Sequence, residues 1–136
     1  METVEKSAVE SELTQLVLSN MSFGPQEIAQ IIQAISGDFS NYRVMRDAVA
    51  ELEVREQRTP ATAVRLGVCY YLMGRYEAAI RTLEEGDRGA LTLFYLGKSN
   101  LALGDYEKAK ECYSAAASAG YDRDTTTLAI AEALRH

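Results

Sequence analysis

The chain has 136 residues, of which 47% are hydrophobic and 25% are charged, and its formal net charge is −6. This length and composition suit a globular protein with a packed core and exclude a disordered chain. The acidic balance and the absence of a Lys/Arg cluster argue against nucleic-acid binding, and no apolar run approaches the roughly 20 residues of a membrane span. The first residues contain neither a basic leader nor an apolar core, so we expect a cytoplasmic protein without a secretory signal.

Proline, glycine and helical periodicity divide the chain into about eight predicted helices, with almost no strand. The first runs from about Val4 to Ser19 and is amphipathic. A second begins at Pro25, and its isoleucines recur at helical spacing. They are Ile28, Ile31, Ile32 and Ile35.

A third helix is predicted from about Ser40 to Arg58. Its inward face should consist of Met45, Ala48, Val49 and Leu52. Thr59-Pro60 then predicts an N-cap followed by proline at the first helical position. A further helix is therefore expected to start there.

Two stretches in the second half of the chain repeat each other at a distance of 30 residues. Residues 66–79 read LGVCYYLMGRYEAA, and residues 96–109 read LGKSNLALGDYEKA. Leu-Gly, Gly, Tyr-Glu and Ala recur at matching offsets. Internal repeats with a period of this order indicate stacked supersecondary units.

This pattern resembles the tetratricopeptide repeat family, in which about 34 residues form two antiparallel helices. Gly67 and Gly97 match the family's small residue in the first helix of a repeat. Ala79 and Ala109 match the small residue in the second helix, and Tyr70 matches a large residue in the first. The resemblance implies an all-α fold of antiparallel helix-turn-helix repeats. These would stack as a short right-handed superhelix, an α-solenoid, with an extra N-terminal helix.

The resemblance also divides the chain into five expected segments. These are an N-terminal amphipathic helix at 1–20, a degenerate repeat-like helix pair at 25–60, a short repeat at 61–89, a second repeat at 90–121 and the first helix of an incomplete third repeat at 122–136. The first repeat is four residues short. Its second helix should therefore lack about one turn.

No arrangement of residues indicates catalysis, a cofactor or a metal. His136 is the only histidine, and Cys69 and Cys112 are expected to be reduced core thiols. Gly97-Lys98-Ser99 resembles the end of a phosphate-binding loop, but Thr92 stands where that motif requires glycine, and the segment is predicted to lie within a helix. We therefore expect a protein that is not an enzyme and binds neither cofactor nor metal.

Tyrosines are frequent, and four of them occupy repeat positions that pack internally in the family. They are Tyr70, Tyr76, Tyr106 and Tyr113. Aromatic stacking on nucleic acid is the alternative for such residues. The repeat positions favour the core.

In tetratricopeptide arrays the first helix of each repeat lines a concave groove, so the resemblance implies a peptide groove in this chain. Its residues would be Val64, Val68, Tyr71, Phe94, Tyr95, Lys98 and Leu101. Val64 and Val68 stand where the family's carboxylate-clamping members carry Lys and Asn, so that ligand is not expected. A mostly apolar groove favours a helical or extended peptide from another protein, as in an adaptor or a chaperone-like module.

Self-association is the alternative, in which the chain forms an assembly scaffold or a homodimer. Either the first helix, through Val9, Leu13 and Leu16, or the last helix, through Leu128 and Leu134, would dock on another copy. The first helix could also fill the groove of its own chain. The sequence leaves partner binding and self-association open.

Overall fold

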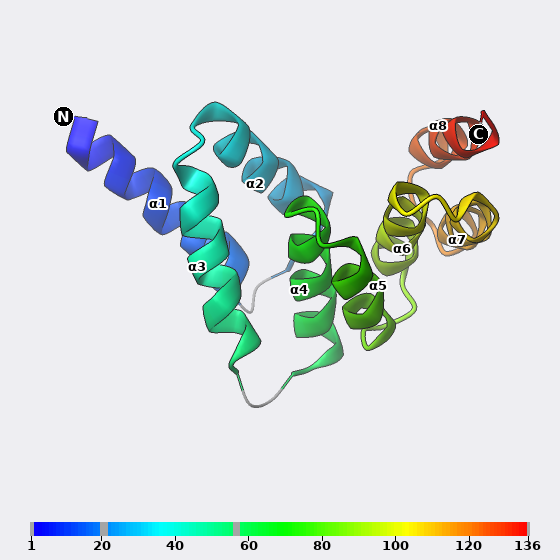
Figure 1. Ribbon diagram of the computed structural model, residues 1–136, viewed down its shortest axis with the longest axis horizontal. Helices are drawn as coiled ribbons and strands as arrows, with labels where there is room; N and C mark the ends of the chain where they lie inside the picture. The colour runs from blue at the N-terminus through cyan, green and yellow to red at the C-terminus, as the bar shows by residue number, and fades with distance from the viewer. Residues whose placement is uncertain (1, 20–21, 56–57, 136) are drawn as a thin grey trace. The chain divides into compact units, whose positions relative to one another are not determined.

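The computed structural model describes residues 2–19, 22–55 and 58–135, with side chains from residue 8 onward. The described residues form eight α-helices and no strand, as predicted (Figure 1). The helices are α1 (Glu2–Leu18), α2 (Pro25–Gly37), α3 (Asn41–Glu53), α4 (Pro60–Leu72), α5 (Tyr76–Glu84), α6 (Ala90–Ala102), α7 (Tyr106–Ser118) and α8 (Arg123–Leu134). They divide into two compact units, a first unit at Met1–Arg58 and a second unit at Thr59–His136.

The first unit buries one face of each of its three helices. Leu13 and Val17 of α1 are fully buried, as are Ile28 and Ile31 of α2, whereas Ile32 is 42% exposed. The four residues predicted to form the inward face of α3 are all buried. These contacts place the core of the first unit between α1, α2 and α3.

The first unit differs from the expected pairing in two respects. α3 packs chiefly against α1 and less against α2, so residues 25–60 do not form a hairpin like those of the second unit. α3 also ends at Glu53 and not near Arg58. Val54 already has a non-helical backbone (φ −89°, ψ 1°), and Thr59, which precedes proline, is extended (φ −78°, ψ 162°), so α3 cannot continue into α4.

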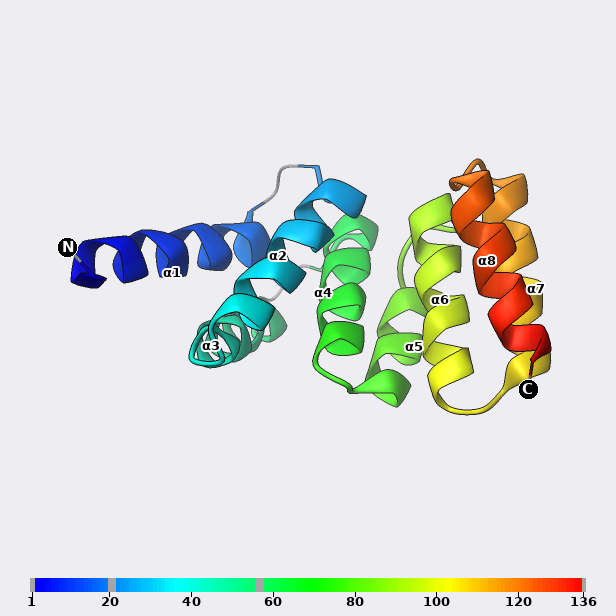
Figure 2. The ribbon, with the colours of Figure 1, turned by 90° about the horizontal axis from the view of Figure 1, so that it is seen from above.

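The second unit consists of two tight helical hairpins and a last helix. α4 pairs with α5, α6 pairs with α7, and α8 packs on α7 (Figure 2). Each hairpin turns at a glycine in the left-handed region, Gly74 (φ 79°) and Gly104 (φ 84°). The following residue donates its N–H to a carbonyl in the last turn of the helix, from Arg75 to Tyr70 and from Asp105 to Asn100. This is the usual way in which glycine ends a helix.

Small residues occupy the positions where the paired helices cross. A Cβ on Gly67 would lie 2.6 Å from Cγ of Leu83 in α5, and a Cβ on Gly97 would lie 2.6 Å from Cδ1 of Tyr113 in α7. Ala79 has no exposed surface. The close helix crossings predicted from the repeat are therefore confirmed.

No helix among the described residues combines the length and the apolar character that crossing a bilayer requires. The longest described helix is α1, with 17 residues, and it carries several charged side chains.

Candidate functional site

A hollow of about 300 Å³ lies on the second unit. Its lining residues come from α4, α6, α7 and α8, and they are Tyr71, Lys98, Leu101, Ala102, Tyr106 and Glu132. In Figure 1, α4, α6 and α8 follow one another along one side of the second unit, with α5 and α7 on the other side. α4, α6 and α8 thus supply five of the six lining residues.

Aromatic rings pack closely beside this hollow. The ring of Tyr95 lies edge-on to those of Tyr71 and Phe94, with centroids 5.5 Å apart in both pairs. The ring of Tyr121 stacks on Phe94 with a centroid distance of 4.2 Å. The Lys98 Nζ lies 5.4 Å from the Phe94 centroid and 5.9 Å from that of Tyr71. Attraction to both ring faces holds the ammonium group over this cluster.

The predicted groove residues are only partly exposed. Tyr71, Lys98 and Leu101 line the hollow, whereas Val64, Phe94 and Tyr95 are at most 7% exposed, and Val68 has no exposed surface. Phe94 is covered by the stacked ring of Tyr121, and Tyr95 by its two aromatic neighbours. The hollow is therefore smaller and more polar than the apolar groove expected from the sequence.

Sequence reasoning did not place Ala102, Tyr106 and Glu132 in the site. Glu132 follows Lys98 by 34 residues, so it has the same repeat position in α8 that Lys98 has in α6. Aligning α8 with α6 at this offset would have identified it. Tyr106 had been predicted to be a core residue, but it is only partly buried and lines the hollow.

The hollow combines both signs of charge with hydroxyl and apolar groups. Burial raises the pKa of Tyr71, and the nearby Tyr76 and Glu132 raise it further. The Tyr71 hydroxyl therefore keeps its proton at neutral pH and can donate a hydrogen bond. With Lys98 as a second donor and Leu101 as apolar surface, the hollow places hydrogen-bond donors beside an apolar side chain.

The two thiols differ in their environment. Cys69 is fully buried, and burial raises its pKa to about 12 although Arg65 acts in the opposite direction. A thiol of this kind is unreactive near neutral pH. Cys112 is free and only half-buried, because its side of α7 is not fully covered, so the prediction of two core thiols holds for Cys69 alone.

The tyrosines predicted to be core residues divide in the same way. Tyr70 and Tyr113 are buried, whereas Tyr76, like Tyr106, is only partly buried. Tyr76 and Tyr106 are the first residues of α5 and α7, where the helix has just emerged from an exposed turn. The described residues contain no cluster of three potential metal ligands, and His136 lies outside them.

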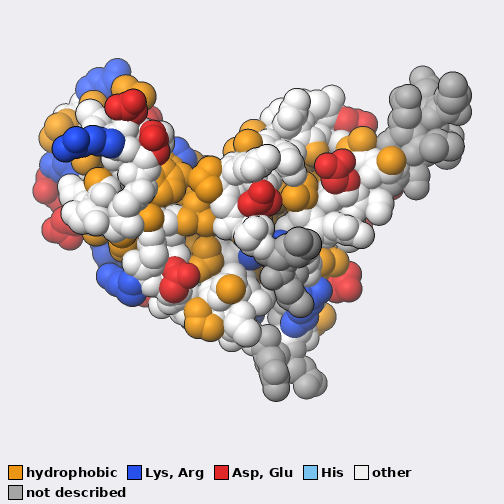
Figure 3. All heavy atoms as spheres, turned by 180° about the vertical axis from the view of Figure 1, so that it is seen from behind, with side chains coloured by type: hydrophobic (Ala, Val, Ile, Leu, Met, Phe, Trp, Pro, Cys, Tyr) orange, Lys and Arg blue, Asp and Glu red, His pale blue; other side chains and the backbone are white. Residues whose placement is uncertain are grey.

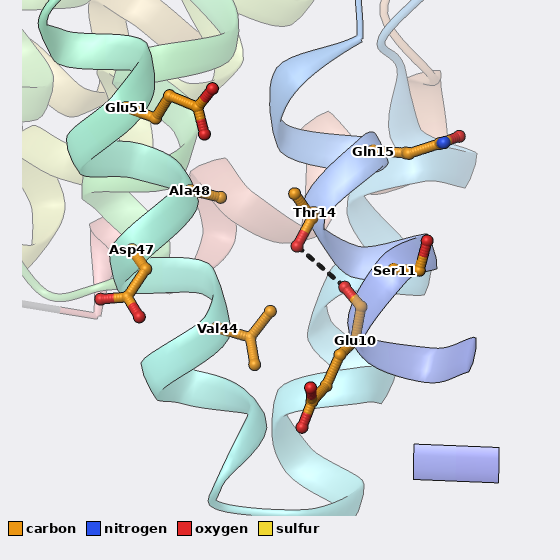
Figure 4. A pocket seen from close by; sticks show the side chains of 8 residues that line it. All are labelled: Glu10, Ser11, Thr14, Gln15, Val44, Asp47, Ala48 and Glu51. Atoms are coloured by element: carbon orange, nitrogen blue, oxygen red, sulfur yellow. Dashed lines mark hydrogen bonds between the residues drawn. The ribbon is translucent and has the colours of Figure 1, made fainter. Parts of the chain in front are cut away.

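A second hollow of about 570 Å³ lies on the first unit between α1 and α3. Figure 4 shows Val44 and Ala48 of α3 directed toward α1, with carboxylates around them. The carboxylates belong to Glu10, Asp47 and Glu51. They do not converge as metal ligands do. We regard them as solvated groups on the surfaces of the two helices.

The residues of α1 predicted for self-association are largely used inside the first unit. Leu13 is 1% exposed and Leu16 is partly buried, whereas Val9 is 39% exposed. All three line a crevice with residues 30, 33 and 34 of α2. Leu13 therefore stabilises its own chain and cannot dock on another copy without unpacking the unit.

Acidic and basic side chains are interspersed on the face of the molecule shown in Figure 3. A continuous basic surface is the electrostatic mark of nucleic-acid binding. Among the described residues, no continuous basic surface is visible on this face.

Comparison with protein-family models matched two segments of the second unit. Residues 62–85 and residues 90–119 each match a model described as tetratricopeptide repeat, and these segments correspond to the α4–α5 and α6–α7 hairpins. Comparisons with curated proteins and with solved structures gave no significant match. Tetratricopeptide repeats generally mediate protein–protein interaction and are typically non-catalytic. Residues 62–85 and 90–119 are therefore tetratricopeptide repeats, and the second unit that contains them has the architecture of a helical-repeat solenoid.

Proposed function

We propose that the chain is a protein-interaction module whose second unit binds a peptide segment of another protein at the hollow between Tyr71, Lys98 and Glu132. The observation that carries this proposal is the hollow itself, which takes side chains from four helices and places donors, an acceptor and apolar surface together. A rigid helical scaffold presents these groups in a fixed arrangement. Presenting the groups in one preorganised arrangement lowers the cost of binding.

The chemistry of the hollow favours an amphipathic ligand segment with at least one acidic side chain. Lys98 is held by two aromatic rings and no ion pair is formed by its Nζ among the described residues, so its charge is available to a carboxylate. Leu101 and Ala102 offer apolar surface on the same helix. A helical segment with anchors at regular spacing would use both features.

The direct test is selection from a displayed library of amphipathic helical peptides, followed by calorimetry with the selected sequences. We expect acidic peptides with spaced apolar residues, and we expect Lys98→Glu to weaken their binding by about tenfold or more because an attraction becomes a repulsion. Lys108→Glu is the matched control, since it makes the same charge change at an exposed position of α7 outside the hollow.

Lys98 is a better test position than Phe94. Phe94 is 4% exposed and contacts three aromatic rings, so a charged residue there would unfold the second unit and mimic a loss of binding. If no peptide is selected, or if Lys98→Glu and Lys108→Glu bind the selected peptides equally well, the hollow is not the binding site.

A further inference from the structure

One face of α8 is left uncovered by the described parts of the chain. Thr126 and Ala133 are buried on the opposite face, where α8 packs on α7. Leu128 is 71% exposed and Leu134 is 64% exposed, and the small residue Ala131 lies exposed between them. Together these residues form a small apolar patch on a 12-residue helix.

The repeat architecture indicates what this face is shaped to accept. Ala131 follows Gly97 by 34 residues and has the same repeat position. In α6 the face around Gly97 is covered by α7, with Tyr113 against the glycine, and in α4 the face around Gly67 is covered by α5. The same face of α8 has a small residue for a close helix crossing, and no described helix fills it.

The charges on this face favour another α8 as the covering helix. Asp124, Leu128, Ala131 and Arg135 recur at helical spacing, so they lie along one line of α8 opposite its packed face. Asp124 and Arg135 lie about 16 Å apart along the axis and cannot pair with each other in one helix. They are equally distant from the midpoint between residues 129 and 130. Two antiparallel copies would therefore bring Asp124 of each beside Arg135 of the other.

We propose that α8 docks antiparallel on α8 of a second copy of this chain and forms a two-fold symmetric homodimer. In this register Leu128 of each copy would lie over the small Ala131 of the other, and two Asp124–Arg135 ion pairs would close the ends. Such an isologous contact needs only one self-complementary surface. Opposed helix dipoles favour the antiparallel orientation as well.

The proposed contact is small, and this sets the affinity to expect. α8 spans roughly 18 Å, so a helix pair of this length buries less than the roughly 1,200 Å² of a stable interface. We therefore expect a concentration-dependent dimer with a dissociation constant in the micromolar range or weaker.

Sedimentation velocity of the full chain over a concentration series up to the millimolar range is the first test. The wild type should shift from monomer to dimer, and the double variant Leu128→Glu/Leu134→Glu should remain monomeric throughout. Both leucines are mostly exposed, so circular dichroism should show the variant as fully folded. Lys108→Glu, which changes an exposed side chain of α7 and none of α8, should dimerise as the wild type does.

Charge exchange tests the antiparallel geometry. Asp124→Arg alone and Arg135→Asp alone each place like charges together twice in the dimer, so each should weaken self-association by about tenfold. The double variant Asp124→Arg/Arg135→Asp should recover wild-type dimerisation. An equimolar mixture of the two single variants should also associate, because every pair across that interface is again of opposite sign.

Three outcomes would overturn the proposal. A wild type that stays monomeric at every concentration would overturn it. This result would also be seen if a helix of a different protein covered this face. A dimer unaffected by Leu128→Glu/Leu134→Glu would place the interface elsewhere. A double charge variant as weak as the single variants would exclude the antiparallel pairing.

Discussion

Replacing Gly97 with alanine tests whether a missing side chain sets the spacing between α6 and α7. In an open helix this change stabilises by about 1 kcal/mol, since alanine has the higher helix propensity. Here the new Cβ would lie 2.6 Å from both Cδ1 and Cε1 of Tyr113 and 3.2 Å from its Cγ. Tyr113 is 1% exposed, and its ring packs on that of Phe94 at a centroid distance of 5.5 Å. The ring therefore cannot withdraw without displacing a second buried ring.

Overpacking of this kind costs roughly 1 to 3 kcal/mol, which exceeds the gain in helix propensity. We expect Gly97→Ala to lose about 1 kcal/mol of unfolding free energy, and at most about 2. Hydrogen exchange measured by mass spectrometry reports the second unit separately from the first. A loss of 1 kcal/mol would speed exchange through global opening in α6 and α7 about fivefold.

Gly37→Ala is the control, because a Cβ at Gly37 would meet nothing within 4 Å. This substitution should leave exchange in the first unit unchanged or slow it. A second control combines Gly97→Ala with Tyr113→Leu, since removing the ring should remove most of the penalty and give a coupling energy of about 1 kcal/mol. If Gly97→Ala stabilised the second unit, or cost as much without the ring as with it, contact with Tyr113 would not set the helix spacing.

The remaining predictions concern the core and one helix start. Ala79→Leu or Ala109→Leu should cost about 1 to 3 kcal/mol in urea denaturation, because both alanines are fully buried at helix crossings; an equally stable variant would contradict this. Burial raises the pKa of Cys69 from 9.0 to about 12. Above about pH 9 the thiol of the unfolded chain therefore loses a proton that the folded chain keeps. The free energy of unfolding should fall by about 1.4 kcal/mol per pH unit up to about pH 12. Cys69→Ala removes only this contribution. Between about pH 8 and about pH 10.5 its free energy of unfolding should therefore fall by about 2 kcal/mol less than that of the wild type. An identical fall in the two proteins would count against the burial effect. Thr59→Ala removes the oxygen that accepts the Thr62 N–H at 3.1 Å and should cost about 1 kcal/mol in thermal unfolding, whereas Thr59→Ser should be nearly neutral.

Local signals in the sequence predicted much of the second unit. The 30-residue offset aligned Gly67 with Gly97, and both lie where a Cβ would collide with the paired helix. Thr59-Pro60 predicted the start of α4, and its capping bond is present. These features depend on residues that lie close together in the chain or recur at a fixed period. For that reason they can be read without knowledge of the fold.

Contacts between distant residues set the details that the sequence did not reveal. Phe94 was predicted to face an open groove, but the ring of Tyr121, 27 positions later, stacks on it. Helical periodicity gave Ile32 the same inward face as Ile28, yet it is 42% exposed because α1 and α3 cover only part of that face. Periodicity identifies a face of a helix. It does not identify the neighbours that cover it or how far they extend.

The short first repeat shows how a deletion is absorbed without loss of the repeat pattern. α5 has 9 residues and α7 has 13, so the difference of four is about one helical turn. The chain after α5 passes close to the start of α4, where a Cβ on Gly86 would lie 2.6 Å from Val64 Cγ2.

Asp87 stabilises the start of α6 through hydrogen bonds. Its Oδ1 accepts hydrogen bonds from the Gly89 N–H at 2.9 Å and from the Thr92 hydroxyl at 2.8 Å. The close approach at Gly86 and the hydrogen bonds to Asp87 thus connect α5 to α6 without the missing helical turn. α6 then packs against both α5 and α4, so the two hairpins stay stacked although the first repeat is shorter than the family's period.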